Sequence, residues 1–246
     1  MTPADASEPD VESGPGASGS AAAPIVPHPG RLLLGSFVML ALDVALLALG
    51  VGGFHELLHH PRAVGLLLVW AAGYGALAGL RRPRARNPLD RRAEQRFVLA
   101  ALVLVPLVTP MASAWCERIG LWPLPGGLML RWFGVALAGA GFLLRILAIG
   151  RLGARFSPAI EIQRDHELET GGVYGWMRHP GYAGALLSNL GAILAFGSAA
   201  PLGLALLMAL ATELRVAREE AALASRFGDE YRRYCARVGR WAPRAR

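Results

Sequence analysis

The sequence predicts an all-α integral membrane protein with about six transmembrane helices. Three observations support this fold class. Hydrophobic residues occupy 54% of the 246 positions and charged residues only 17%. With glycine counted and tyrosine left out, the apolar share is about 64%, against roughly 45–50% in soluble domains. Finally, the apolar residues form long runs and the basic residues lie almost entirely between alternate runs. A single soluble domain of this length could not bury so much apolar surface.

The chain begins with a segment of different composition. Residues 1–30 are rich in Ala, Ser, Gly and Pro, and no basic residue precedes Arg31. A secretory signal would begin with a positively charged segment followed by an apolar one. We therefore expect residues 1–30 to be a disordered tail.

The apolar runs give the number of helices. Four runs approach the roughly 20 residues that cross a bilayer: Leu32–Val51, Val64–Leu80, Phe97–Ala114 and Leu128–Ile149. A fifth run, Tyr182–Leu214, is long enough for two short crossings if the chain turns at Gly197–Pro201. The last two helices would then form a tight hairpin.

The distribution of arginine gives the orientation. The net charge is +7, and all 25 basic residues are Arg. Of these, 21 fall on one side of the predicted membrane, in residues 1–31, 81–96, 150–180 and 215–246. The opposite side keeps Arg62 and Arg118, and the fourth long helix carries Arg131 and Arg145 near its ends, where they can snorkel. By the positive-inside rule the Arg-rich side, with both termini, is cytoplasmic. Membrane orientation thus explains the basic excess, and we expect no nucleic acid partner.

The polar segment before the fifth run is a candidate binding site. Pro180 suits the first turn of a helix, which makes His179 the N-cap residue. Ser, Thr, Asp and Asn are the favoured N-caps, so a weak cap here leaves the first N–H groups free to bind an anion such as a carboxylate. The alternative is an ordinary helix start with an interfacial Arg and Tyr.

The last long helix carries the second candidate site. Nothing interrupts it from Leu202 to Phe227, and Gly228 is a plausible C-cap. Arg215 and Glu219 are four residues apart and share a face near the membrane surface. The alternative is an ordinary surface ion pair.

Other features indicate packing rather than chemistry. Asp43 is an isolated acid within an apolar run, and we expect a polar contact between helices. Small residues recur at three- and four-residue spacing, which permits close helix packing: Gly134, Ala138, Gly141, Gly184, Ser188 and Gly191. His55, His59 and His60 have no Cys or carboxylate cluster nearby, so we expect no metal site.

Two motifs together resemble a known family. The first motif contains Gly172-Val173-Tyr174, Arg178-His179-Pro180, Tyr182 and Gly184. The second motif contains Arg215, Arg218-Glu219-Glu220, Leu223, Phe227-Gly228-Asp229-Glu230-Tyr231 and Tyr234. In this order they resemble the isoprenylcysteine carboxyl methyltransferase family and its bacterial relatives, which include phospholipid N-methyltransferases. The resemblance covers roughly residues 156–243.

This resemblance implies a pocket for S-adenosylmethionine at the cytoplasmic membrane surface, formed by the 150–180 segment and the C-terminal helix. The cofactor-binding residues it implies are His166, Glu167, Leu168, Glu169, Tyr174, His179, Pro180, Gly181, Tyr182 and Glu219. Arg215 matches the position associated with the substrate. A Gln found in some members falls on Ala159. The chain would divide into the tail, a variable transmembrane region (31–127) and a methyltransferase core (128–246).

The implied reaction is methyl transfer to a lipid-like or membrane-partitioned acceptor in a bacterial inner membrane. The acceptor would be an isoprenylcysteine carboxylate, a lipid amine or a thiol, with the lipid bilayer as the other partner. Two alternatives remain. One is an NADPH-dependent reductase of the sterol-reductase type, for which Arg232, Arg233 and Arg237 could bind a 2′-phosphate. The other is a catalytically silent membrane scaffold.

Overall fold

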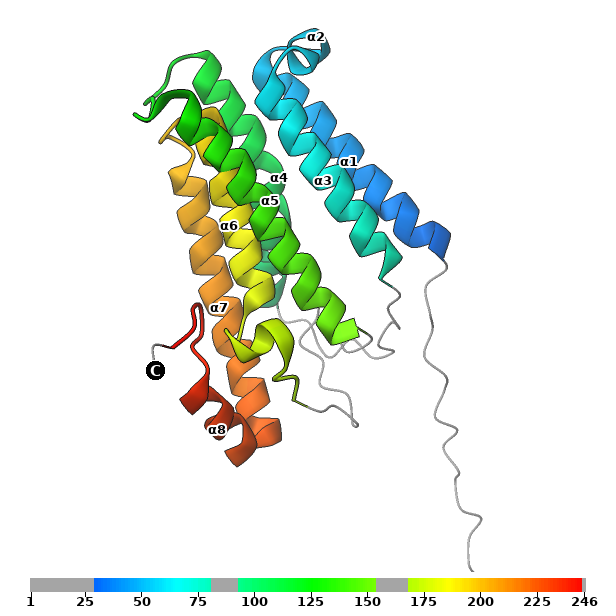
Figure 1. Ribbon diagram of the computed structural model, residues 1–246, viewed down its shortest axis with the longest axis vertical. Coiled ribbons are helices and arrows are strands. Elements are labelled where there is room, and N and C mark those ends of the chain that lie inside the picture. The colour runs from blue at the N-terminus through cyan, green and yellow to red at the C-terminus, as the bar shows by residue number, and fades with distance from the viewer. Residues whose placement is uncertain (1–28, 81–92, 154–167, 245–246) are drawn as a thin grey trace, which may run out of the picture.

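Long helices that run between two ends of the molecule build the architecture (Figure 1). The computed structural model describes residues 29–80, 93–153 and 168–244, and in these residues it contains helices and two isolated bridges but no β-strand. The elements are α1 (Pro29–Val51), α2 (Phe54–Leu58), α3 (Pro61–Gly79), α4 (Ala93–Arg118), α5 (Gly127–Leu152), the 3-10 helix η2 (Gly172–Gly175), α6 (Pro180–Phe196), α7 (Leu202–Phe227) and α8 (Asp229–Arg237). The predicted tail lies outside the described residues except for Pro29 and Gly30, which begin α1.

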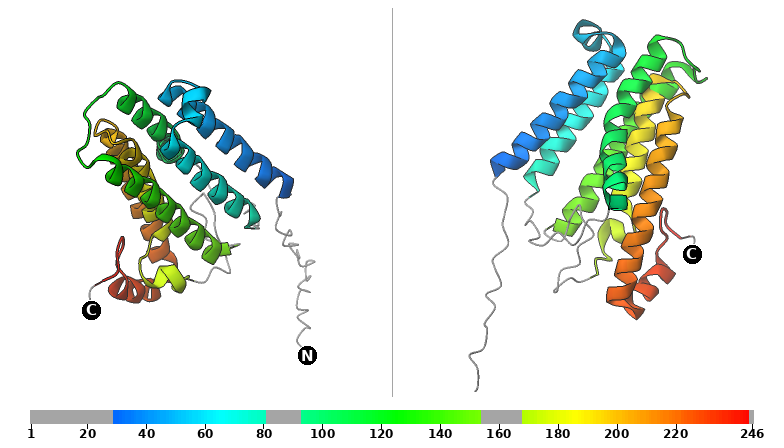
Figure 2. Two further views of the ribbon diagram at one scale, coloured as in Figure 1. Left: turned by 45° about the horizontal axis from the view of Figure 1, so that its top comes forward. Right: turned by 180° about the vertical axis from the view of Figure 1, so that it is seen from behind.

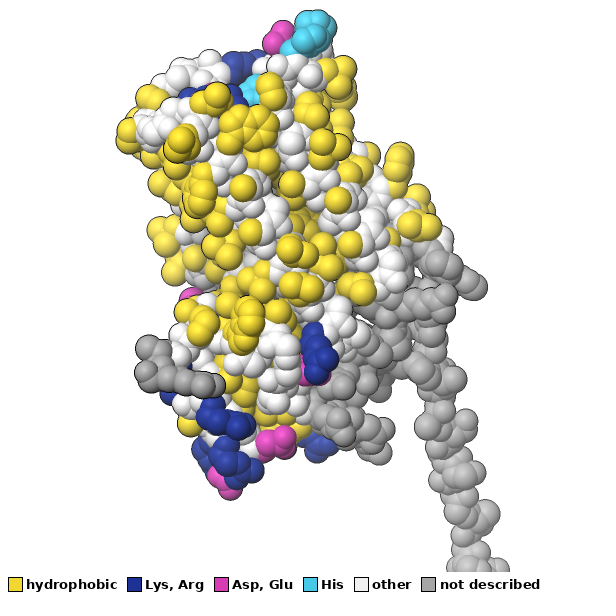
Figure 3. Space-filling model, viewed as in Figure 1, with side chains coloured by type: hydrophobic (Ala, Val, Ile, Leu, Met, Phe, Trp, Pro, Cys, Tyr) yellow, Lys and Arg dark blue, Asp and Glu magenta, His cyan; other side chains and the backbone are white. Residues whose placement is uncertain are grey.

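Among the residues that the structure describes, four helices are long and apolar enough to cross a membrane. Their candidate spans are Leu33–Val51, Pro61–Gly79, Phe97–Arg118 and Gly127–Leu152. Hydrophobic side chains cover the middle of the molecule, and charged ones gather at its two ends (Figure 3). Exposed aromatic and aliphatic side chains such as Phe37, Leu68 and Met129 would be costly in water but suit a bilayer. The chain is therefore an all-helical membrane protein, as predicted.

The predicted boundaries of the last two helices agree with the structure. α6 is an apolar helix of 17 residues that ends at Gly197, whose φ of 63° is in the left-handed region open to glycine. α7 runs unbroken for 26 residues and ends at Gly228, the predicted C-cap. The short helices α2 and α8 were not predicted, because five and nine residues are too short for a clear apolar period.

The predicted small residues bring α5 and α6 into close contact. A Cβ atom added at Gly134 would lie 2.4 Å from the backbone nitrogen of Ala195, and one added at Gly141 would lie 2.5 Å from the backbone oxygen of Gly184. Any side chain at these positions would force the helices apart. α6 also contacts α3, α4 and α7, and Figure 2 shows it between α5 and α7 from two further directions. This central position holds the start of α6 in a fixed place.

A partly buried ion-pair cluster joins the helices at the end of the molecule that carries α2. Glu117 of α4 accepts hydrogen bonds from Arg62 of α3, at 3.0 Å, and from Arg131 of α5. Nε2 of His60 lies 3.3 Å from its other oxygen. Arg62 also donates to the backbone oxygen of Ala195 on α6. We call Glu117, His60, Arg62 and Arg131 the Glu117 cluster.

Asp43 makes the interhelical polar contact that was predicted. The Tyr74 hydroxyl on α3 donates a 2.8 Å hydrogen bond to the Asp43 carboxylate on α1. Asp43 is 5% exposed, so this bond partly compensates for removing the carboxyl group from water.

Candidate functional site

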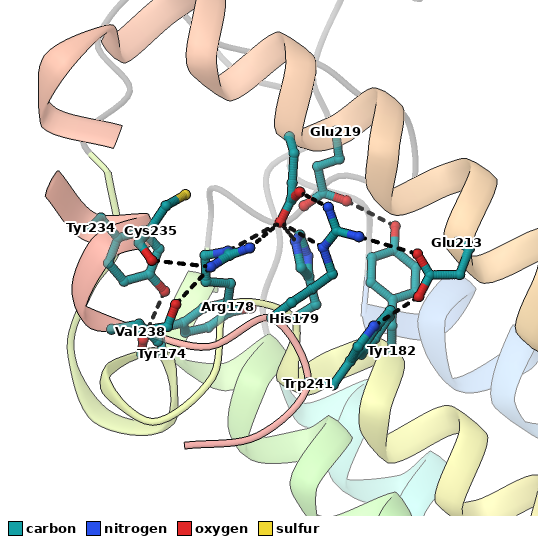
Figure 4. Close-up of polar contacts among 12 residues, drawn as sticks. Tyr174, Arg178, His179, Tyr182, Glu213, Glu219, Tyr234, Cys235, Val238 and Trp241 are labelled. Carbon is teal, nitrogen blue, oxygen red and sulfur yellow. Dashed lines mark hydrogen bonds and ion pairs between the residues drawn. The ribbon is translucent and has the colours of Figure 1, made fainter. Parts of the chain in front are cut away.

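Segments far apart in the sequence meet at the end of the molecule that carries α8. They are η2, the start of α6, the second half of α7 and the residues that follow α8. Figure 4 shows their polar side chains directed toward one another. Both predicted sites, the one before α6 and the one on α7, therefore belong to one place.

The start of α6 is organised as predicted. His179 is the N-cap residue and Pro180 occupies the first turn. The His179 side chain makes no capping hydrogen bond; its Nε2 atom instead lies 3.1 Å from an oxygen of Glu220. The first-turn N–H groups of a helix have no carbonyl partners within it, and they carry a partial positive charge. The start of α6 can therefore bind an anion.

The Glu220 carboxylate contacts three basic side chains. Nε and Nη2 of Arg178 donate to its Oε1 atom at 3.1 and 3.0 Å. Arg240 donates to both of its oxygens, at 3.2 Å from Nε to Oε1. His179 is the third, and we call these four residues the Glu220 cluster. Burial alone would raise the pKa of the Glu220 carboxyl, but hydrogen bonds from His179, Arg240 and Arg178 outweigh it and hold the pKa well below its usual range.

The C-terminal segment is fastened to the same cluster through its backbone. The backbone N–H of Arg178 donates to the oxygen of Gly239 at 2.9 Å, and Nη1 of Arg178 donates to the oxygen of Val238 at 2.7 Å. Trp241 donates from Nε1 to Glu213 of α7 at 2.8 Å. Residues 238–241 therefore lie across α7 and the start of α6, and hold them together.

The hydroxyl of Tyr182 joins the two residues that were predicted on α7. It donates a 3.0 Å hydrogen bond to Oε2 of Glu219 and accepts one of 3.2 Å from Nε of Arg215. Arg215 is only 4% exposed. The residues do share a face of α7, but a tyrosine of α6 connects them. A carboxylate, a phenol and a guanidinium are thereby aligned directly beside the start of α6.

The residues around η2 close another side of the site. The Glu169 carboxylate accepts from the backbone N–H of Gly171 at 2.9 Å and from Nε of Arg151 at 3.2 Å. The backbone oxygen of Tyr174 accepts a 2.7 Å hydrogen bond from Tyr234 of α8. Burial, with the nearby Glu219 carboxylate, holds the pKa of the Tyr174 phenol well above its usual range, so this ring stays neutral.

Leu168 takes a different place from the polar residues predicted beside it. It packs against an apolar cluster at α8 formed by Tyr231, Tyr234 and Val238. Its direct role in the structure is thus to anchor the chain before η2. His166, Glu167 and Ala159 lie outside the described residues.

Sequence reasoning assigned no role to several residues that build this site. Arg178 and Glu220 belong to the quoted motifs, and their opposite charges beside His179 and Glu219 were the available indication. Arg240, Trp241 and Glu213 gave no indication, since only the folded chain brings residues 240 and 241 to α7. Among the residues that the structure describes, no group of three His, Cys, Asp or Glu side chains could hold a metal ion.

Part of the site lies within a stretch that matches known proteins. The family model of the isoprenylcysteine carboxyl methyltransferase (ICMT) family matches residues 134–225, which contain α6 and most of α7. The chain is 36% identical over 101 residues to protein-S-isoprenylcysteine O-methyltransferase of Schizosaccharomyces pombe, which is 40% of this chain and 43% of the relative. It is 33% identical over 124 residues to protein-S-isoprenylcysteine O-methyltransferase B of Arabidopsis thaliana, covering 48% and 63% of the two chains.

A third relative extends the match slightly further. The protein-S-isoprenylcysteine O-methyltransferase of Tribolium castaneum is 31% identical over 138 residues, which is 53% of this chain and 49% of the relative. The chain thus matches about half the length of these relatives, and less than two thirds of any of the three. The stretch matched by the family model contains the first motif and the start of the second, with His179, Tyr182, Arg215 and Glu219. Over this stretch the chain is similar to the isoprenylcysteine carboxyl methyltransferase family.

Proposed function

We propose that the protein is an integral membrane methyltransferase that uses S-adenosylmethionine and methylates a lipid-like acceptor of the isoprenylcysteine carboxylate type. The observation that carries the proposal is the uncapped start of α6 beside the Tyr182–Glu219 pair. The names of the relatives support the same reaction over reduction by NADPH. Of the arginines considered for a 2′-phosphate, Arg232 is exposed and donates to Asp229 on its own helix.

The charges of the site fit the methyl donor, which is a zwitterion that carries an additional sulfonium. The first-turn N–H of Gly181 suits its carboxylate, whereas Pro180 has no N–H and the His179 N–H donates to the backbone oxygen of Arg240 at 3.3 Å. The Glu219 carboxylate suits its ammonium or its sulfonium. Tyr174 and Tyr182 offer aromatic faces to a cation. When bound, S-adenosylmethionine supplies an already activated methyl group.

The segment before η2 would complete the pocket. We assign cofactor contacts to His166, Glu167, Leu168 and Glu169, of which Glu169 holds the chain near Gly171. The Glu220 cluster would act indirectly, since it fixes His179 and Arg178 in place while its own hydrogen bonds are used within the protein.

The protein's contribution to methyl transfer is positioning and exclusion of water, which can lower a barrier by roughly 7–11 kcal/mol. A carboxylate or thiolate acceptor needs no general base, whereas an ammonium acceptor must first lose a proton. No base is needed in our proposal, and Arg215 lies on the acceptor side, where its positive charge favours an anionic head group.

We further propose that α6 and α7 cross the membrane as a hairpin, which gives six crossings. The charged half of α7 would then extend into the cytosol with the site and both chain termini. The arginine distribution supports this orientation. A bacterial inner membrane is the compartment that we propose.

Binding of S-adenosylmethionine to the detergent-purified full chain tests the proposal, with Glu219→Gln and His179→Ala beside the wild type. We expect Glu219→Gln to weaken binding about 10- to 100-fold, because a hydrogen bond to a charged group is lost. Glu230→Gln is the matched control, since Glu230 is exposed on α8 at the same end of the molecule. Wild-type binding no tighter than that of Glu219→Gln would refute the proposed site.

The acceptor class needs a second experiment. Membranes that contain the overproduced protein are incubated with methyl-labelled cofactor and a prenylcysteine analogue, total lipids or small thiols, and products are identified by mass. We expect a methyl ester of the prenylcysteine analogue. Cofactor binding without any labelled product would favour a silent scaffold instead.

A further inference from the structure

Arginines on α8 have no part in the proposed function. Arg233 and Arg237 are four residues apart and therefore share one face of this helix. Both are exposed, and in the part of the chain that the structure describes neither makes an ion pair or a side-chain hydrogen bond. The two acids of α8, Asp229 and Glu230, lie in its first turn, at the end of the helix away from Arg237. Figure 3 shows basic side chains gathered at this end of the molecule.

Arg244 adds a third cation at the same place. Its Nη1 atom donates a 2.6 Å hydrogen bond to the backbone oxygen of Ala236, which directly precedes Arg237. The last carbonyl groups of a helix carry a partial negative charge, which favours cations there. A guanidinium that binds one carbonyl keeps its charge and its other N–H donors. We call Arg233, Arg237 and Arg244 the α8 arginine cluster.

An exposed tryptophan lies beside this cluster. Trp176 directly follows η2 and is 67% exposed. The next residue, Met177, forms an isolated parallel bridge with Gly239, two residues after Arg237. Tryptophan is enriched where a membrane meets water, because its ring is apolar and its N–H is polar. An exposed indole next to unpaired guanidinium groups is therefore typical of a membrane interface.

The length of α6 places this surface at the level of the phospholipid head groups. Its 17 residues span about 25 Å, which is less than the ~30 Å of hydrocarbon in a bilayer. In the six-helix topology proposed above, the start of α6 therefore lies at the edge of the hydrocarbon. The backbone N–H groups of Arg178 and His179 donate to the oxygens of Gly239 and Arg240 at 2.9 and 3.3 Å. The segment after α8, which runs back alongside α7 (Figure 1), thus lies at the same level.

We propose that the α8 arginine cluster and Trp176 bind the head group of an anionic phospholipid in the cytoplasmic leaflet. Guanidinium groups bind phosphate oxygens through paired, charge-assisted hydrogen bonds. The indole would lie where the head groups meet the acyl chains. A leaflet that contains anionic lipids attracts basic residues, and a Debye length of about 8 Å at physiological ionic strength limits this attraction to residues at the membrane surface.

An acidic protein is the other partner that this positive charge would fit. Such a partner would use the arginines, but it would not require them to lie at the level of the head groups beside an exposed indole. The position of the surface therefore favours the lipid. The inference uses the proposed six-helix topology but not the proposed methyl transfer, because the α8 arginine cluster and Trp176 are separate from the residues assigned to the cofactor and the acceptor.

The test measures the affinity of the detergent-purified full chain for two lipid probes by native mass spectrometry. Short-chain phosphatidylglycerol and phosphatidylcholine have the same acyl chains, and only the first has a net negative charge. We expect the wild type to prefer phosphatidylglycerol about 10-fold or more, since each arginine near a membrane surface contributes up to about 5-fold. The triple variant Arg233→Gln, Arg237→Gln and Arg244→Gln should lower this preference about 10-fold.

Arg232→Gln is the matched control, because Arg232 is exposed on the same helix but is paired with Asp229. It removes one positive charge, as Arg237→Gln does, and should lower the preference less than about 2-fold, whereas Arg237→Gln should lower it up to about 5-fold. Arg237→Gln alone serves if the triple variant does not fold. Trp176→Ser should weaken the binding of both lipids to the same extent, since the indole carries no charge.

Two results would overturn the lipid site. One is a wild type that binds both lipids equally, and the other is a triple variant whose preference falls no further than that of Arg232→Gln. Competition identifies the ligand further, and neither inorganic phosphate nor a polyglutamate peptide should displace phosphatidylglycerol at an equal concentration. Displacement by phosphate would reassign the surface to a free anion, and displacement by the peptide alone would reassign it to an acidic protein.

Binding of S-adenosylmethionine, measured on the same samples, separates this inference from the proposed function. We expect the triple variant to change the cofactor dissociation constant less than about 2-fold. A wild type that prefers phosphatidylglycerol but binds no cofactor would reject the proposed methyltransferase and leave the lipid site in place. A wild type that binds the cofactor without any lipid preference would reject the lipid site alone.

Discussion

Two helices of this protein begin with His-Pro, and they begin differently. α3 starts at Pro61 after the N-cap His60, and α6 starts at Pro180 after the N-cap His179. Nδ1 of His60 accepts a 3.3 Å hydrogen bond from the backbone N–H of Ala63, so it caps its helix. His179 does not cap α6. The same dipeptide therefore caps the start of α3 and leaves the start of α6 available to a ligand.

The surroundings of the two histidines extend the comparison. Each contacts a glutamate that also binds two arginines, Glu117 in one case and Glu220 in the other. In the Glu117 cluster, Arg62 also donates a hydrogen bond to a backbone oxygen of α6. The Glu220 cluster has a second carboxylate next to it, Glu219, which is bonded to Tyr182. The same electrostatic arrangement stabilises the fold at one end and supports a candidate site at the other.

Removal of each central carboxylate should give the largest effects. Glu117→Gln and Glu220→Gln each weaken a cluster in which the glutamate side chain is about 15% exposed, and each should cost about 1–3 kcal/mol of stability. Only Glu220→Gln should also weaken cofactor binding, by roughly 10-fold, since it frees His179 and Arg178. Thermal unfolding and cofactor titration of both variants measure this. Equal cofactor affinities in the two variants would contradict the division of roles between the ends.

Substitution of the two histidines should affect protein stability and cofactor binding differently. His60→Ala removes an N-cap and should cost about 1 kcal/mol, with cofactor affinity unchanged. His179→Ala removes no cap, so α6 should lose less stability from its start, while cofactor affinity falls several-fold. For each variant, the loss of stability is compared with the loss of cofactor affinity. A stability loss in His179→Ala that matches His60→Ala, without a change in binding, would mean that both starts are structural.

The stability of the Glu220 cluster should depend on pH in the acidic range. The pKa of Glu220 in the folded protein is lowered from its ordinary value of 4.5. Its contribution is therefore fully present above about pH 4.5 and is lost as the pH falls toward the lowered pKa. Melting temperatures of the wild type and Glu220→Gln, measured from pH 7 to pH 3, should differ by a constant amount at the upper end and converge below pH 4.5. A difference that grows as the pH falls would contradict the lowered pKa.

The smallest effect is expected at the surface of α8. Arg232 pairs with Asp229 three residues before it, and both side chains are more than 70% exposed. Arg232→Gln should leave cofactor binding unchanged and shift the melting temperature no more than other surface substitutions do. A clear loss of binding of the cofactor would instead indicate that α8 contacts a ligand directly.

Much of the fold follows from the sequence. Long apolar runs predict the membrane helices, since only a helix satisfies its own backbone in a bilayer. Pro180 and Gly228 mark a helix start and a helix end because their backbone chemistry acts locally. The small residues of α5 and α6 predict close packing. His179, Tyr182, Arg215 and Glu219 could be named because they belong to motifs within single helices.

Tertiary structure alone decided which of these residues act together. The sequence alone does not show which group each imidazole contacts. That contact is what distinguishes His60, which caps its helix, from His179, which does not. Nor does sequence separation predict that Arg240 contacts Glu220, or that Arg145 donates a hydrogen bond to the backbone oxygen of Gly181. Each of these contacts depends on where other helices lie, and burial makes hydrogen bonds to the nearest available partner obligatory. The sequence thus determined the helices and the chemical groups at their ends, and the packing of α5, α6 and α7 determined the site.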